Sequence, residues 1–266
     1  MRRWVFRLTL LGALLLAAIA AASQAERWLF YPFDPRHVAP AQAGLSGVTE
    51  TRLDTPDGKS LIVWSAPAQA GQPVILYFHG NAGNLAVRAG RFQHFLDRGY
   101  GLIAPAYRGS SGSSGTPSEA TLTADARLIY DRMKPPGPVV VYGESLGTAV
   151  AISLVAGLDR KPAGLLLEAP FTSIKALARA HYPALADYAD KLQNKWPSRA
   201  RAGQLSLPLF ILHGTQDELI PHKMGKAIYK AAPGPRKTFY SVKGGGHTDL
   251  WRSTTLPRIW RFIDGL

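Results

Sequence analysis

The chain of 266 residues contains no cysteine. Disulfide bonds, zinc sites with thiolate ligands, iron–sulfur clusters and a cysteine nucleophile are therefore excluded. Its seven histidines show no H-E-x-x-H or related spacing, which indicates that there is no metal centre. A P-loop and a G-x-G-x-x-G turn at the start of a helix are also missing, so we predict that the protein needs no cofactor.

Acidic residues are scarce beside basic ones: 18 Asp and Glu stand against 31 Lys and Arg, a net charge of +13. With 46% hydrophobic residues the chain is too apolar to be a disordered polycation, so it is predicted to be globular. The basic residues are scattered in short groups and form no nucleic-acid-binding module, so we expect no nucleic-acid partner. An anionic membrane surface is the expected partner of this charge.

Residues 1–25 form a separate segment. Arg2, Arg3 and Arg7 precede an uncharged apolar run over residues 8–22, and small residues follow at a spacing that suits signal-peptide cleavage near Ala25. Two interpretations stay open: a cleaved signal peptide, or an uncleaved anchor in which residues 4–25 associate with the membrane. Both predict that the rest of the chain is exported, and that rest still carries +10 once the three arginines are subtracted.

The remaining residues, 26–266, alternate between strand-like and helix-like patterns. The continuous apolar strands indicate burial on both faces, which is typical of a mostly parallel sheet with helices on both sides. An early pair of alternating strands predicts an antiparallel hairpin at the edge of the sheet. We therefore predict one α/β domain. The expected strands are 48–54, 61–66, 74–78, 101–104, 139–142, 164–167, 207–212 and 238–242, and the expected helices include 85–98, 146–157 and 222–231.

A G-x-S-x-G pattern at residues 143–147 places Ser145 between an apolar strand and a helix of small residues. This strand–turn–helix context is typical of a nucleophilic serine held on a sharp turn. A helix N-cap serine is the structural alternative, but that role does not explain both glycines. We predict that Ser145 is a catalytic nucleophile.

A serine nucleophile needs a histidine base and a carboxylate to orient that base. Asp217 and His247 follow the next-to-last and last predicted strands, so all three side chains are expected at one edge of the sheet. We predict a Ser145–His247–Asp217 triad. Glu168 also follows a strand and is the rival acid, whereas Asp249 is expected to hold the histidine loop or cap the last helix. His79 and His213, each beside a glycine at a strand end, are expected to be structural.

These motifs and three others resemble the α/β-hydrolase superfamily over nearly all of the exported part. The further motifs are Y-F-H-G-N-A-G-N at 77–84, Y-R-G with G-T-P-S-E at 107–119, and E-A-P-F-T-S at 168–173. The sequence is most similar to small, lid-poor serine hydrolases with an N-terminal hydrophobic segment, among them membrane-bound depalmitoylating thioesterases. The resemblance implies an α/β-hydrolase fold and an oxyanion hole in which the backbone N–H of Asn81 joins that of Leu146.

The expected lid insertion is short, covering residues 169–206. Hydrophobic residues recur there near helical spacing, and one face could line an acyl pocket or simply pack in the core. The residues in this stripe are Phe171, Ile174, Leu177, His181, Tyr182, Leu185, Tyr188, Leu192 and Trp196. We predict a serine hydrolase that cleaves lipophilic esters or thioesters through an acyl-enzyme. A serine peptidase of the same fold and a noncatalytic binding protein are the alternatives.

The N-terminal segment predicts an enzyme anchored in the membrane that faces the periplasm or cell exterior, or a secreted or periplasmic enzyme after cleavage near Ala25. We expect the anchored form, because the aromatic residues at 28–31 follow at once and suit the headgroup level. Mass spectrometry of the mature N-terminus should then show the original terminus in a membrane pellet. A terminus at Glu26 would establish cleavage, and an uncleaved soluble cytoplasmic chain would contradict both forms.

Overall fold

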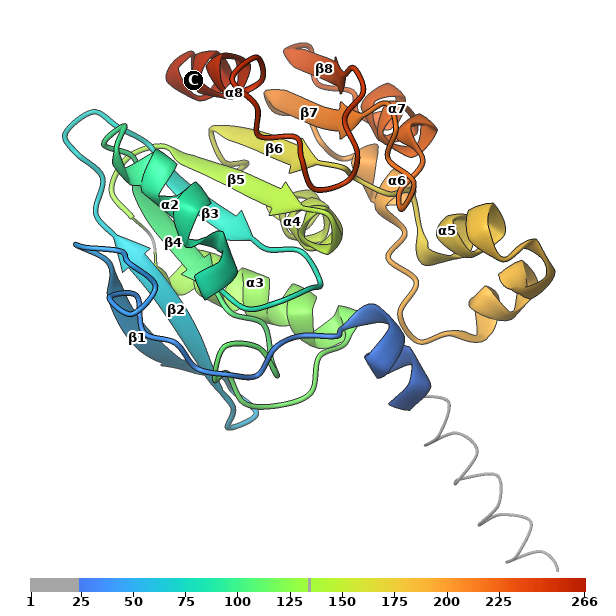
Figure 1. Ribbon diagram of the computed structural model, residues 1–266, viewed down its shortest axis with the longest axis horizontal. Helices are drawn as coiled ribbons and strands as arrows, with labels where there is room; N and C mark the ends of the chain where they lie inside the picture. Colours follow the sequence, from blue (N-terminus) through green and yellow to red (C-terminus); the bar gives the residue numbers. More distant parts are fainter. Residues whose placement is uncertain (1–23, 134) are drawn as a thin grey trace, which may run out of the picture.

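The computed structural model describes residues 24–133 and 135–266 (Figure 1). The predicted N-terminal segment therefore lies outside the described residues, except for its last two. Within the described part of the chain, no helix combines the length and the hydrophobicity needed to cross a bilayer.

The core of the molecule is one eight-stranded sheet with the strand order β1-β2-β4-β3-β5-β6-β7-β8 (Figure 1). β1 pairs antiparallel with β2, and β2 pairs antiparallel with β4, while all other neighbours are parallel. The fold class predicted from the sequence, with its antiparallel hairpin at the edge, is confirmed. The strands are β1 (Thr49–Asp54), β2 (Ser60–Ala66), β3 (Val74–Phe78), β4 (Gly101–Pro105), β5 (Val139–Glu144), β6 (Gly164–Glu168), β7 (Leu209–Gly214) and β8 (Lys237–Val242).

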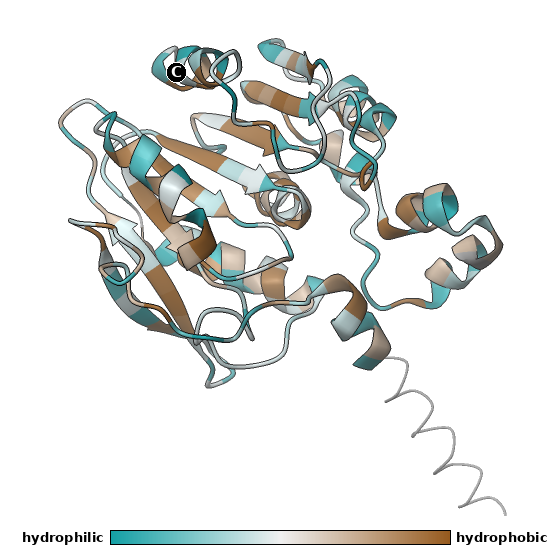
Figure 2. Ribbon diagram, in the orientation of Figure 1, coloured by the Kyte–Doolittle hydropathy of each residue, from teal (hydrophilic) through white to brown (hydrophobic). Residues whose placement is uncertain are grey.

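Helices cover both faces of the sheet, and each face has its own hydrophobic core. On one face, α3, α4, α6 and α7 pack with strand residues such as Val63 and Val141. On the other face, α2 and α8 pack with the alternate strand residues, such as Trp64 and Tyr142. Figure 2 shows hydrophobic residues concentrated along the central strands. The helices are η1 (Ala86–Arg88), α2 (Ala89–Leu96), α3 (Glu119–Met133), α4 (Leu146–Ala156), α5 (Ile174–His181), η2 (Pro183–Lys191), α6 (Ser198–Ala202), α7 (His222–Ala231) and α8 (Leu256–Asp264).

The short insertion between β6 and β7 contains α5, η2 and α6, and its hydrophobic stripe is not one helical face. Pro183 cannot continue α5, so the chain turns at Tyr182 and resumes as the 3-10 helix η2. Phe171 and Trp196 are fully buried, whereas Tyr182 and Tyr188 are exposed. The expected single stripe was therefore wrong, since its two ends pack in the core and its middle faces outward.

The turn between β5 and α4 depends on two glycines that allow very close backbone contact. A Cβ atom at Gly143 would lie 2.5 Å from the carbonyl oxygen of Gly147. A Cβ atom at Gly147 would lie 1.9 Å from the carbonyl oxygen of Phe78, which ends β3. The N-terminus of α4 is thus packed directly against the backbone of β3.

We expect Gly147→Ala to destabilise the protein by about 3 kcal/mol or more, because the backbone around Phe78 would have to move. The matched control is Gly90→Ala in α2, where a Cβ would meet nothing within 4 Å. That control should leave stability unchanged or raise it by up to about 1 kcal/mol, the helix-propensity gain of alanine. Urea unfolding of both variants measures the difference, and equal stabilities would contradict the close packing.

Candidate active site

The three predicted site residues lie in loops at the carboxyl ends of three parallel strands of the sheet. Ser145 follows β5, Asp217 lies between β7 and α7, and His247 lies between β8 and α8. In open α/β sheets, ligands bind at this edge. The loops after β7 and β8 are held close together, since a Cβ at Gly214 would lie 2.3 Å from the carbonyl oxygens of Gly245 and Gly246.

Ser145 has a backbone conformation that L-residues rarely adopt, with φ 52° and ψ −114°. Its N–H donates to the carbonyl oxygen of Glu168 at 2.9 Å, and the Thr148 hydroxyl donates to its carbonyl oxygen at 2.6 Å. Ser145 occupies the N-cap position of α4, yet its side chain makes no capping hydrogen bond. The hydroxyl is therefore left available for another partner.

That partner is His247. The Nε2 atom of His247 lies 3.0 Å from the Ser145 hydroxyl oxygen, and its Nδ1 atom lies 2.8 Å from Oδ2 of Asp217. The structure thus brings the three predicted side chains into one continuous chain of hydrogen bonds. Residues that are 102 and 30 positions apart in the sequence meet here.

The Asp217 carboxylate has a full set of donors. Burial by itself raises its pKa, but hydrogen bonds from His213 and His247 and from the Ile220 backbone outweigh burial and hold the pKa well below its usual range. Its Oδ1 accepts the N–H groups of Leu219 and Ile220, at 3.0 and 2.7 Å. Asp217 is therefore ionised at neutral pH, as a carboxylate that orients a histidine must be.

The two backbone donors predicted for an oxyanion hole lie near the Ser145 turn. Leu146 is the first residue of α4, so its N–H has no acceptor within the helix. Asn81 follows the end of β3, and the contact between Gly147 and the Phe78 carbonyl brings that strand end against the start of α4. The Leu146 N–H, which directly follows Ser145 and has no acceptor within the helix, would suit a developing negative charge.

His79 and His213, expected to be structural, are fully buried at their strand ends. The Nδ1 of His79 donates to the Gly80 carbonyl oxygen at 2.7 Å. Burial, followed by the charge of Arg88, lowers the His79 pKa to about 3, so its ring is neutral. The Nε2 of His213 donates to the Ile220 carbonyl oxygen at 2.9 Å and supports the loop that carries Asp217.

Glu168, the rival acid, is occupied by other partners. Its carboxylate accepts hydrogen bonds from Arg91 at 2.5 and 2.9 Å, from the Tyr142 hydroxyl at 2.6 Å and from the Trp251 indole at 3.0 Å. The Arg91 guanidinium also stacks 4.9 Å from the Trp251 ring centre. This buried group links α2, β5, β6 and the loop after His247.

Nothing in the local sequence of Arg91, Tyr142 and Trp251 indicates which distant carboxylate they bind, so these partners of Glu168 were not predicted. The Arg88–Glu144 pair next to Ser145 was not predicted either. Burial opposes ionisation of Glu144, but Arg88 and then Arg91 lower its pKa to about 2.

Asp249 accepts the Gly246 N–H at 2.7 Å and so holds the histidine loop. The alternative role for Asp249, capping the last helix, was wrong because α8 begins only at Leu256.

Within residues 24–133 and 135–266, no group of three or more His, Asp or Glu side chains is arranged to hold a metal ion.

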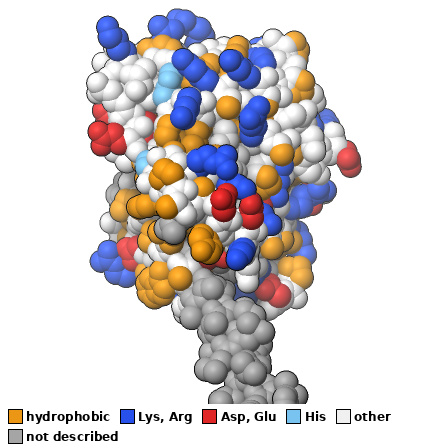
Figure 3. Space-filling model, turned by 90° about the vertical axis from the view of Figure 1, so that its right-hand side faces the viewer, with side chains coloured by type: hydrophobic (Ala, Val, Ile, Leu, Met, Phe, Trp, Pro, Cys, Tyr) orange, Lys and Arg blue, Asp and Glu red, His pale blue; other side chains and the backbone are white. Residues whose placement is uncertain are grey.

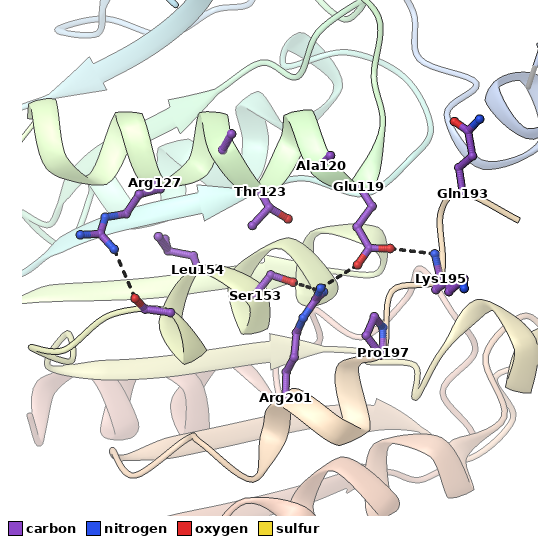
Figure 4. Close-up of a pocket in the computed structure, with 12 residues that line it drawn as sticks. Glu119, Ala120, Thr123, Arg127, Ser153, Leu154, Gln193, Lys195, Pro197 and Arg201 are labelled. Carbon is purple, nitrogen blue, oxygen red and sulfur yellow. Dashed lines mark hydrogen bonds and ion pairs between the residues drawn. The ribbon is translucent and has the colours of Figure 1, made fainter. Parts of the chain in front are cut away.

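A cavity of about 670 Å³ opens between α3, α4 and residues 193–201 (Figure 4). Its wall includes Ser153, which lies about 12 Å along α4 from Ser145. Arg201 bridges this wall to Ser153 at 2.7 Å and to Glu119 at 2.8 Å. The cavity thus lies where the insertion packs against α3 and α4, away from the hydrogen-bonded Ser145, His247 and Asp217.

The fold and the arrangement at the strand ends define an α/β hydrolase. A family model described as serine aminopeptidase, S33, matches residues 69–200 and 197–251, and the chain belongs to this hydrolase family. An uncharacterized protein of Mycobacterium tuberculosis H37Rv is 32% identical over 251 residues, covering 91% of this chain and 88% of the relative. The rat lysophosphatidylserine lipase ABHD12 is 32% identical over 233 residues, covering 77% of this chain but only 58% of the lipase.

Solved structures agree on the fold. The esterase Pf2001 of Pyrococcus furiosus superposes with a TM-score of 0.70 at 16% identity, covering 88% of this chain and 97% of the esterase. Mouse α/β-hydrolase domain-containing protein 10 gives a TM-score of 0.64 at 17% identity, covering 82% of this chain and 97% of the mouse chain. The family match, on this fold, identifies the protein as a hydrolase.

Glu168→Gln should destabilise the protein by about 3 kcal/mol, because it leaves the largely buried Arg91 without its anionic partner. The matched control is Asp131→Asn, which breaks the exposed pair of Arg127 and Asp131 and should cost less than about 0.5 kcal/mol. Denaturant midpoints at neutral pH measure both effects. Equal losses would show that the Glu168 network contributes nothing beyond an ordinary surface pair.

Proposed function

We propose that the protein is a serine hydrolase that cleaves carboxylic esters or thioesters with lipophilic acyl groups. The observation that carries the proposal is the hydrogen-bonded chain from the Ser145 hydroxyl through His247 to the ionised Asp217. The noncatalytic alternative gains no support, since a binding protein has no need to keep all three groups in contact.

In the proposed reaction, Nε2 of His247 takes the hydroxyl proton as the Ser145 oxygen attacks the acyl carbonyl carbon. The carbonyl oxygen becomes an oxyanion, which the N–H groups of Leu146 and Asn81 stabilise. His247 then gives its proton to the departing alkoxide or thiolate, leaving an acyl-enzyme. A water molecule, deprotonated by His247, attacks the acyl-enzyme. As the bond to Ser145 breaks, His247 returns that proton to the Ser145 oxygen, and the acid product and free Ser145 are released.

Asp217 acts on His247 rather than on the substrate. Its bond to Nδ1 selects the tautomer in which Nε2 is unprotonated and faces Ser145. The negative charge also stabilises the imidazolium that forms during attack. Since hydrogen bonds hold the Asp217 pKa well below its usual range, this charge persists across the pH range in which histidine titrates.

The proposed preference for lipophilic acyl groups is supported by a relative that is named a lipase and by the small size of the insertion at 169–206. ABHD12 is named a lysophosphatidylserine lipase, and the chain is 32% identical to it over 233 residues. The family description instead names an aminopeptidase, which keeps a serine peptidase as the second candidate. Peptidases of this fold usually gate their substrates with a larger insertion than the 38 residues at 169–206 provide.

We also propose that the N-terminal segment holds the enzyme at a membrane, on the exported side.

A fluorophosphonate should label Ser145 covalently, because only an activated hydroxyl beside oxyanion donors attacks it quickly. Ser145→Ala and His247→Ala should each abolish turnover, and the double variant should be hardly worse than either, since the two groups act as a unit. Mass spectrometry locates the label. A panel of p-nitrophenyl esters of graded acyl length, beside peptide amides, measures turnover.

Labelling of another residue, or none in folded protein, would contradict the enzyme proposal. Additive losses in the double variant would contradict the coupling of Ser145 and His247. Faster cleavage of the amides than of every ester would favour the peptidase.

A further inference from the structure

The first described helix, residues 24–30, has one side buried in the protein and the other side exposed to solvent. Glu26 is only 8% exposed and Tyr31, which follows the helix, only 4%. Trp28 and Leu29 are each 70% exposed. The usual arrangement is thus partly reversed here: the helix buries a carboxylate and exposes two of its three large apolar side chains, while the third, Phe30, packs against the core.

The buried side of this helix is fastened to the insertion between β6 and β7. The Glu26 carboxylate accepts the backbone N–H groups of Gln193 and Asn194, at 3.0 and 3.2 Å, and the Asn194 side-chain amide at 2.7 Å. The Tyr31 hydroxyl donates to Oδ1 of Asn194 at 2.7 Å and accepts the Trp196 indole N–H at 3.0 Å. The helix is therefore hydrogen-bonded to residues 193–196, the segment that follows η2.

The adjoining insertion exposes two further aromatic side chains, Tyr182 and Tyr188, which are 65% and 63% exposed. Cationic groups lie over two of the exposed rings: Lys191 over Tyr188 at 5.3 Å and Arg27 over Trp28 at 5.8 Å. We call Arg27, Trp28, Leu29, Tyr182, Tyr188 and Lys191 the docking face. Figure 3 views this side of the molecule, where hydrophobic side chains gather in the lower half and Lys and Arg lie above and beside them.

The charge around the docking face is positive. Residues 174–195 of the insertion carry Lys175, Arg179, Lys191 and Lys195 against Asp187 and Asp190. Asp190 pairs with Lys175, and its pKa is lowered first by that hydrogen bond and further by the charges of Lys195 and Arg179. The part of the insertion that exposes Tyr182 and Tyr188 therefore carries a surplus of cationic side chains.

We infer that the docking face lies on an anionic lipid bilayer. Tryptophan, tyrosine and long cationic side chains together suit the boundary between headgroups and acyl chains, because each combines an apolar body with a polar tip. A bilayer would cover the exposed Trp28 and Leu29 while the cations meet anionic headgroups. The sequence places an uncharged apolar run, residues 8–22, directly before this helix.

The docking face adjoins the loop that carries Asp217. Nε2 of His181, next to Tyr182, donates to the Leu219 carbonyl oxygen at 2.8 Å, and the Leu219 N–H donates to Asp217. Docking would therefore bring the rim of the proposed active site to the lipid surface, so that acyl substrates enter from the bilayer. This consequence rests on the proposed function, whereas the docking itself does not.

The absence of cysteine allows a local test in the full chain. Tyr188→Cys, labelled with an environment-sensitive fluorophore and mixed with phosphatidylcholine vesicles that contain phosphatidylglycerol, should shift its emission to the blue and resist quenching by iodide. The matched control is Arg52→Cys in β1, at the far edge of the sheet from the insertion. The control label should stay quenchable. Equal quenching of both labels would overturn the inference.

Two further variants separate the charge from the apolar contact. Lys191→Glu in the labelled chain should remove the extra protection that phosphatidylglycerol gives over pure phosphatidylcholine, weakening the docked state about tenfold. Trp28→Ser with Leu29→Ser should reduce protection in both lipids. Arg52→Glu is the charge-reversal control and should change nothing.

Hydrolysis of a short soluble ester reports whether each variant is folded and active, and it should be unchanged in all of them. Protection that survives both docking-face variants would overturn the inference even if the esterase activity stands. If the parent chain hydrolyses no ester, circular dichroism replaces hydrolysis as the check of folding. Protection of the Tyr188→Cys label in that chain, lost in folded docking-face variants, would then support docking while rejecting the proposed function.

Discussion

The close contact between Gly147 and the backbone of β3 is the constraint on which the site depends. It lets the N-terminus of α4 pack against the end of a neighbouring strand, where any larger residue would collide with the Phe78 carbonyl. The same contact forces a sharp turn, and Ser145 occupies that turn with a positive φ angle. Backbone strain of this kind persists only where the surrounding structure holds it in place. Here the Glu168 carbonyl and the Thr148 hydroxyl do so.

Two carboxylates near the site have different environments: Glu168 at the end of β6 and Asp217 in the loop after β7. Asp217 lies against two histidines and two backbone N–H groups, so its negative charge is directed at His247. Glu168 lies against Arg91, Tyr142 and Trp251, so its charge is already compensated. The environment of each group, rather than its position at a strand end, therefore separates a candidate catalytic acid from a structural one.

Much of this architecture could be predicted from the sequence because it depends on local pattern. Short apolar runs between turn signals predicted every strand of the sheet to within two residues at each end, and strand-end positions predicted that Ser145, Asp217 and His247 would lie together. Their catalytic roles remain predictions. The partners of Glu168 could not be predicted, because Arg91 and Trp251 reach it from helix and loop positions 77 and 83 residues away. The continuous stripe in the insertion was wrong because Pro183 interrupts the helix that periodicity alone would extend.

We propose that Asp217, not Glu168, supplies the carboxylate that orients His247. Steady-state kinetics of Asp217→Asn and Glu168→Gln on one p-nitrophenyl ester, with rates expressed per folded molecule, test it most directly. The account predicts that Asp217→Asn lowers kcat by about 10⁴-fold with KM nearly unchanged, because the wrong histidine tautomer then faces Ser145. It predicts a much smaller loss for Glu168→Gln. A larger loss of kcat in Glu168→Gln than in Asp217→Asn would contradict the account.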